Sequence, residues 1–352
     1  MKQNLKIEEI FNLATQNYQT NNLKVAEDLF KKILKINPNH FEAIFFLGTI
    51  SAQLKKFDIG LKLLNKTLEI QPNYLHAHIN LGNTFRELNK PEEAIKSYLR
   101  AIKIDPNSLP TYINLATTFK DLGEYEKSIS YYEKVIKIDP NQALANNNLG
   151  ILYGKLKNFE KAQKFCEKAI QIEPNYSAAH YNLGLVFHGL GKYQKAINCY
   201  EKTILIQPGH VDSYNNLGVL FRELGNFKKA ISCYENALKY DSENLTYLYQ
   251  LSDLKKEILN LELRKKINKI ITLDNCTKKN LAYGNFLLAK FELKKKKYKK
   301  VLDYLIKGHE CYFDLNVEKF NKAVDYCLNE LPKINERIDV NQSNQNNNNS
   351  SS

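Results

Sequence analysis

The sequence predicts an all-α solenoid built from stacked pairs of antiparallel helices, and three observations support this fold class. Proline recurs at a constant interval, at Pro38, Pro72, Pro106, Pro140, Pro174 and Pro208. Leucine and aromatic residues between these prolines recur at three- and four-residue steps, which is the spacing of an apolar stripe on a helix. Glycine and alanine recur at fixed positions within each period, where two helices of one pair come close together. A fixed period of this kind indicates a repeat architecture.

Each period opens with a predicted helix that carries Asn-Leu-Gly followed by an aromatic residue. The pattern occurs at Asn80-Leu81-Gly82 with Phe85, Asn148-Leu149-Gly150 with Tyr153, Asn182-Leu183-Gly184 with Phe187, and Asn216-Leu217-Gly218 with Phe221. A second helix carries a small residue and an aromatic residue four positions later, as in Ala94 and Tyr98, Ala196 and Tyr200, and Ala230 and Tyr234. Proline lacks a backbone N–H and disfavours helical geometry in the residue before it, so it ends each pair.

These residues resemble the tetratricopeptide repeat (TPR) family in both helices and in period. The resemblance implies a right-handed superhelix whose concave wall is formed by the first helices. A single helix pair cannot cover its own apolar stripe, so neighbouring pairs must stack. We place seven repeats, which together span 7–244, at 7–40, 41–74, 75–108, 109–142, 143–176, 177–210 and 211–244.

The remainder of the chain departs from this pattern. Residues 245–276 form a degenerate repeat, because Arg264 and Asn268 stand where the second helix normally has alanine and an aromatic residue. Residues 277–338 predict a divergent helical hairpin and a C-terminal helix, interrupted by the lysine run 294–297. This part resembles the spacer before the sulfotransferase domain in bacterial TPR-sulfotransferase fusions. Residues 339–352 are almost all Asn and Ser, a composition that predicts a disordered tail.

The composition is that of a folded protein, with 43% hydrophobic and 25% charged residues. Glu8 and Glu9 stand where a signal peptide would need an apolar core, and no apolar stretch approaches the ~20 residues that span a bilayer. We therefore expect a cytoplasmic protein that does not contact membranes. The six cysteines include no C-x-x-C pair, so we expect reduced structural thiols and no metal site.

The sequence contains no recognisable catalytic motif. The segment Gly150 to Lys155 is one residue short of a phosphate-binding loop and lies within a predicted helix. We therefore expect no enzyme activity, no catalytic residue and no cofactor. The net charge of +13 could suggest nucleic acid, but Arg86, Lys120 and Arg222 are each followed by an acidic residue. A nucleic-acid groove would be more uniformly basic, so we expect no nucleic-acid partner.

One position of the first helix, here called the asparagine column, reads Asn80, Asn114, Asn148, Asn182 and Asn216. Asparagine is only a moderate helix former, so helix propensity does not explain its recurrence. The array resembles that of the O-linked N-acetylglucosamine transferases, whose inner asparagines hold an extended peptide backbone. This resemblance implies a peptide-binding site formed by the column together with Arg86, Lys120 and Arg222. Alternatively, the asparagines hydrogen-bond between neighbouring repeats and only maintain the superhelix.

Two functions follow from this interpretation. The first is a protein interaction scaffold or adaptor that binds an extended polypeptide in the concave groove. The second is the substrate-binding arm of a sulfotransferase or glycosyltransferase whose catalytic domain is absent from this chain, either because it has been lost or because it is encoded separately. The sequence identifies neither the partner nor the oligomeric state.

Overall fold

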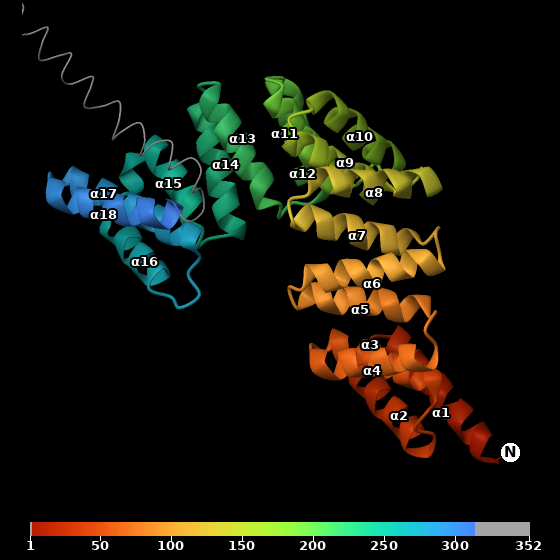
Figure 1. Cartoon of the computed structure of the whole chain (residues 1–352). Helices are drawn as coiled ribbons and strands as arrows, with labels where there is room; N and C mark the ends of the chain where they lie inside the picture. Colours follow the sequence, from red (N-terminus) through yellow and green to blue (C-terminus); the bar gives the residue numbers. More distant parts are fainter. Residues whose placement is uncertain (1, 314–352) are drawn as a thin grey trace, which may run out of the picture. The chain divides into compact units, whose positions relative to one another are not determined.

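The computed structural model describes residues 2–313, and within this range all regular elements are helices (Figure 1). The expected all-α repeat solenoid is confirmed. The chain divides into two compact units, Met1–Cys199 and Tyr200–Ser352, which are described separately.

The first unit contains consecutive helix pairs. They are α1 (Lys2–Gln19) with α2 (Leu23–Ile36), α3 (Phe41–Gln53) with α4 (Phe57–Ile70), α5 (Leu75–Glu87) with α6 (Pro91–Ile104), α7 (Leu109–Asp121) with α8 (Tyr125–Ile138), and α9 (Ala143–Lys155) with α10 (Phe159–Ile172). Helix α11 (Ser177–Gly189) follows, and the division falls within α12 (Tyr193–Ile206). The two helices of each pair pack together, and the second packs on the first helix of the next pair.

Two kinds of turn produce the constant period. Within a pair, the turn after the first helix contains a residue with positive φ, namely Asn21, Lys55, Asn89, Gly123, Lys157 and Gly191. Between pairs, the Asp105 carboxylate accepts a hydrogen bond from the Asn107 backbone N–H at 2.9 Å, and Asp139 and Asn141 repeat this contact at 3.0 Å. These aspartates fold the chain tightly around the proline that lies between them and the asparagine.

The core of each pair depends on one small residue that faces one large residue. A Cβ atom on Gly82 would lie 2.4 Å from the Tyr98 ring, so only glycine fits beside this tyrosine. Tyr98 is fully buried, as are Tyr132, Tyr200 and Tyr234 at the same position of other second helices. Cys166 takes this position in the fifth pair, where its sulfur faces Gly150. The recurring glycines therefore make room for the buried aromatic residues.

The second unit contains α13 (Val211–Glu223), α14 (Phe227–Tyr240), α15 (Leu245–Leu254), the 3₁₀ turn η1 (Lys256–Ile258), α16 (Leu261–Ile271), α17 (Lys278–Lys294) and α18 (Tyr298–Phe313). Arg264, which breaks the repeat pattern, pairs with the buried Glu292 carboxylate at 2.6 Å. Lys290 donates to Ser252 at 2.9 Å and also contacts Asp253. In this unit, ion pairs therefore hold α17 against α15 and α16.

The lysine run lies where α17 ends, and Lys294 to Lys297 are exposed. The expected disordered tail, 339–352, and the part of the expected C-terminal helix beyond residue 313 lie outside the described residues. No helix within residues 2–313 has the length and hydropathy needed to cross a membrane.

Candidate functional site

The asparagine column lies on successive first helices. Asn80, Asn114, Asn148 and Asn182 belong to α5, α7, α9 and α11 of the first unit, and Asn216 belongs to α13 of the second. Asn148 is buried, with 8% of its surface exposed, whereas the other four are partly buried. The amides therefore lie at a partly covered surface rather than on a fully solvated helix face.

Two amides bond to the preceding helix pair. The Asn80 side-chain N–H donates to Thr49 Oγ1 at 2.8 Å, and the Asn182 N–H donates to Asn147 Oδ1 at 2.9 Å. An asparagine amide has two N–H donors and an oxygen that can accept two hydrogen bonds. Each of these side chains therefore keeps one N–H and its oxygen without a partner among the described residues.

Asn148 is held at both ends of its amide. Lys120 Nζ donates to its oxygen at 3.0 Å, and its own N–H donates to the Leu144 carbonyl at 2.9 Å. The Asn148 amide therefore has little hydrogen-bonding capacity left for a ligand. The Asn114 amide and the Arg86 guanidinium, by contrast, make no hydrogen bond or ion pair with any residue in the described range.

In the second unit, the Arg222 guanidinium donates to the side-chain oxygen of Gln250 on α15. Gln250 stands one repeat period after Asn216, so it continues the column with a longer amide. The sequence prediction missed Gln250 because it followed asparagine alone, although the period would have located it. Lys120 and Arg222 occupy equivalent positions, and each donates to an amide in the next repeat.

Two equivalent surface cavities adjoin the column in the first unit. One, of about 280 Å³, lies between α3 and α5 and includes Asn80, and the other, of about 270 Å³, lies between α9 and α11 and includes Asn182. Their walls correspond position by position, three repeat periods apart: Thr49 to Ile151, Ala52 to Gly154, Asn83 to Leu185, and Thr84 to Val186. The cavity beside Asn80 is therefore the more polar of the two, whereas the one beside Asn182 is almost entirely apolar.

No group of His, Cys, Asp and Glu side chains within residues 2–313 is arranged to hold a metal ion. Burial raises the pKa of the Cys166 thiol to about 12 and the pKa values of Cys199 and Cys233 to about 11. These thiols are therefore protonated at neutral pH, in the form that is a poor nucleophile.

Family models match the repeat region of this chain. Models described as "Tetratricopeptide repeat" match residues 76–108, 97–130, 141–207 and 175–243, and one described as "TPR repeat" matches 116–157. A comparison with curated proteins gives no match.

Several solved structures are similar. The C-terminal part of a TPR repeat-containing protein from Cytophaga hutchinsonii is 20% identical, with a TM-score of 0.56 over 68% of this chain and 99% of that one. A tetratricopeptide repeat protein from Parabacteroides merdae is 16% identical, with a TM-score of 0.55 over 70% and 98%. MamA is 30% identical over 47% of this chain and 98% of its own, with a TM-score of 0.44. Repeat period, helix pairing and family matches agree, and the chain is a tetratricopeptide repeat protein.

Proposed function

We propose that this protein is a non-catalytic adaptor that binds an extended polypeptide along the asparagine column. The observation that carries the proposal is the position of Asn80 and Asn182. They line equivalent cavities three repeats apart, and each keeps an unused N–H and an unused oxygen among the described residues.

The chemistry of the amide suits a peptide backbone. Its oxygen accepts from a peptide N–H while its remaining N–H donates to a peptide carbonyl, so it binds main chain whatever the side-chain sequence. The hydrogen bonds to Thr49 and Asn147 hold the two amides in one orientation before binding. This lowers the conformational entropy that binding would otherwise cost. Asn148 and Lys120 already bond to each other, so in this proposal they hold the neighbouring helices in place rather than contact the peptide.

The two cavity walls add side-chain selectivity to this backbone recognition. Ile151, Leu185 and Val186 favour a large apolar side chain of the peptide beside Asn182. Thr49, Asn83 and Thr84 favour a polar one beside Asn80. The preferred ligand is therefore an extended segment with a polar residue toward one end and an apolar residue toward the other.

The test begins with capture of partners from native lysate and identification by mass spectrometry, followed by titration of the captured segment. Replacing Asn80 and Asn182 together with alanine removes two peptide hydrogen bonds per amide, four in all, and at ~0.5 kcal/mol or more each this should weaken binding at least ~30-fold. The matched control is Asn198→Ala, an exposed asparagine on the second helix α12, which should leave the affinity unchanged.

A second variant tests the apolar cavity. A Cβ atom added at Gly154 would meet no atom closer than 4.0 Å, so the backbone here accepts a side chain, and Gly154→Leu should extend into the cavity and block the peptide. If the double asparagine variant melts at a lower temperature yet binds with unaltered affinity, the column only ties repeats together. Full binding by Gly154→Leu would remove the apolar cavity from the site.

A further inference from the structure

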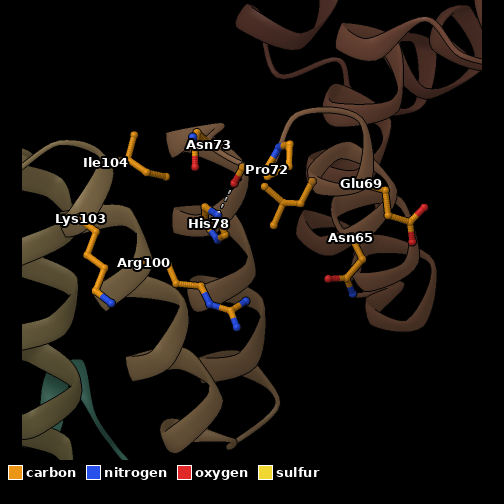
Figure 2. A pocket seen from close by; sticks show the side chains of 9 residues that line it. Asn65, Glu69, Pro72, Asn73, His78, Arg100, Lys103 and Ile104 are labelled. Carbon is orange, nitrogen blue, oxygen red and sulfur yellow. Dashed lines mark hydrogen bonds between the residues drawn. The ribbon is translucent and has the colours of Figure 1, made fainter.

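A further cavity of the first unit lies away from the asparagine column. It has a volume of about 1000 Å³ and is bordered by α4, α6 and the turn that leads into α5 (Figure 2). Its polar walls come from Asn65, Glu69, Asn73, His78, Arg100 and Lys103. These residues belong mainly to second helices, whereas the column belongs to first helices.

The next repeat shows why space opens here. There, the rings of Tyr112 and Tyr131 stack with centroids 6.2 Å apart, and Lys134 Nζ lies 5.6 Å and 5.1 Å from them. One period earlier, these three positions are His78, Ser97 and Arg100. Of these three residues, His78 and Arg100 line the cavity, and a histidine fills less volume than the tyrosine found one repeat later.

Because the two tyrosine rings are absent from this repeat, the cation at the equivalent position, Arg100, lacks the aromatic partners that Lys134 has. Lys134 is attracted by the two ring faces, as expected for a cation–π contact. Arg100 has neither ring, and among the residues that the structure describes neither Arg100 nor Lys103 forms an ion pair with a carboxylate. Two positive charges therefore border the cavity without an ion-pair partner, together with the carboxylate of Glu69.

The remaining side chains complete a site for an anion. In Figure 2, Arg100 and Asn65 point toward each other from opposite walls, while the Glu69 carboxylate is turned away from Arg100. The His78 Nε2 lies 2.9 Å from the Pro72 carbonyl. Because a carbonyl can only accept, Nε2 carries the hydrogen, and this bond fixes the ring in place.

We propose that this cavity binds the carboxylates of an acidic segment of a protein partner. The planar guanidinium of Arg100 matches a carboxylate with two parallel hydrogen bonds. Lys103 adds a second charge, and the Asn65 amide can donate. Glu69 and the carbonyl ends of α4 and α6 place negative charge at the rim. This opposes a doubly charged phosphate more than a singly charged carboxylate.

The experiment measures fluorescence anisotropy of a labelled tetraglutamate peptide with the full chain. Arg100→Gln should weaken binding ~10-fold or more, as expected for loss of a charge-assisted hydrogen bond. The matched control is Lys134→Gln, which removes one positive charge from the equivalent, ring-covered position and should change the affinity by less than ~2-fold. His78→Tyr with Ser97→Tyr introduces the aromatic pair of the next repeat and should abolish binding while keeping both cations.

Circular dichroism verifies that the double variant is folded, and Arg100→Gln tests the site independently of that result. Equal losses in Arg100→Gln and Lys134→Gln would show diffuse attraction to a basic protein and would overturn the proposal. Equal binding of a tetraglutamine peptide, no binding of tetraglutamate, or stronger competition by inorganic phosphate than by free glutamate would also overturn it. The Asn80 and Asn182 double variant should bind tetraglutamate normally, which separates this site from the column.

Discussion

The buried tyrosines of the second helices allow a stability test in which the same substitution has opposite effects. The Tyr98 hydroxyl donates to Asn83 Oδ1 at 2.7 Å. Tyr234 occupies the equivalent position four repeats later, but Val219 stands in place of Asn83. Its hydroxyl is buried and has no hydrogen-bond partner in the described part of the chain. Burial raises the pKa of both tyrosines to about 12, so both are neutral in an assay near neutral pH.

The magnitudes follow from the hydrogen bond that each tyrosine makes or lacks. Tyr98→Phe removes a hydrogen bond with a net value of ~1 kcal/mol and should destabilise by about that amount. Tyr234→Phe removes a hydroxyl whose unpaired burial costs ~1–3 kcal/mol and should be neutral or stabilise by up to ~1 kcal/mol. The two variants should therefore differ by ~1–2 kcal/mol in their free energy of unfolding.

Urea unfolding of both variants and the parent protein measures the difference. Because repeat arrays can unfold in parts, amide hydrogen exchange at α6 and α14 should accompany it. Tyr98→Phe should speed exchange in its own repeat, and Tyr234→Phe should not. If both substitutions destabilise equally, the hydrogen bond to Asn83 has no net value and the reasoning is wrong.

Three further predictions concern other parts of the chain. Lys31 and Lys56 hydrogen-bond to the buried Glu27 carboxylate and hold its pKa below 4.5, so this stabilisation of ~1 kcal/mol is present above that pH and is lost as pH falls through the folded-state pKa. Glu27→Gln should therefore lower the melting temperature at neutral pH and have little effect once the solution is acidic enough to protonate the carboxylate. Lys157 has a φ of 58°, so Lys157→Gly should raise the melting temperature by relieving ~1 kcal/mol of backbone strain, whereas Gly123→Ala, at φ 78°, should lower it. Purified protein should transfer neither sulfate nor sugar from activated donors, and turnover that recurs in an independent preparation would contradict the non-catalytic proposal.

Arg264 has a role in the structure that its place in the repeat does not indicate. The sequence prediction treated this arginine as a sign of degeneracy because it replaces a small residue of the second helix. The structure pairs it with Glu292, a residue on α17 with only 2% of its surface exposed. A repeat pattern reveals that such a position differs from the others. The pattern does not reveal the partner of Arg264, because Glu292 lies outside the repeats and has no equivalent position within them.

By itself, the sequence determined the family, the length of the period and the residue types at each helix position. Proline geometry, the helical spacing of apolar residues and the size of glycine are local properties, and each can be read within one period. Tertiary structure alone decided what each position contacts. Asn80 and Asn148 share a column, yet one bonds to Thr49 and borders a cavity while the other is buried and held by Lys120. The cavity beside Arg100 is likewise lined by residues of α4, α5 and α6, and His78 stands there where the next repeat has Tyr112, whose ring stacks on Tyr131. Hydrogen-bond partners and cavities depend on how the side chains of several helices fill one space, which no single period of the sequence specifies.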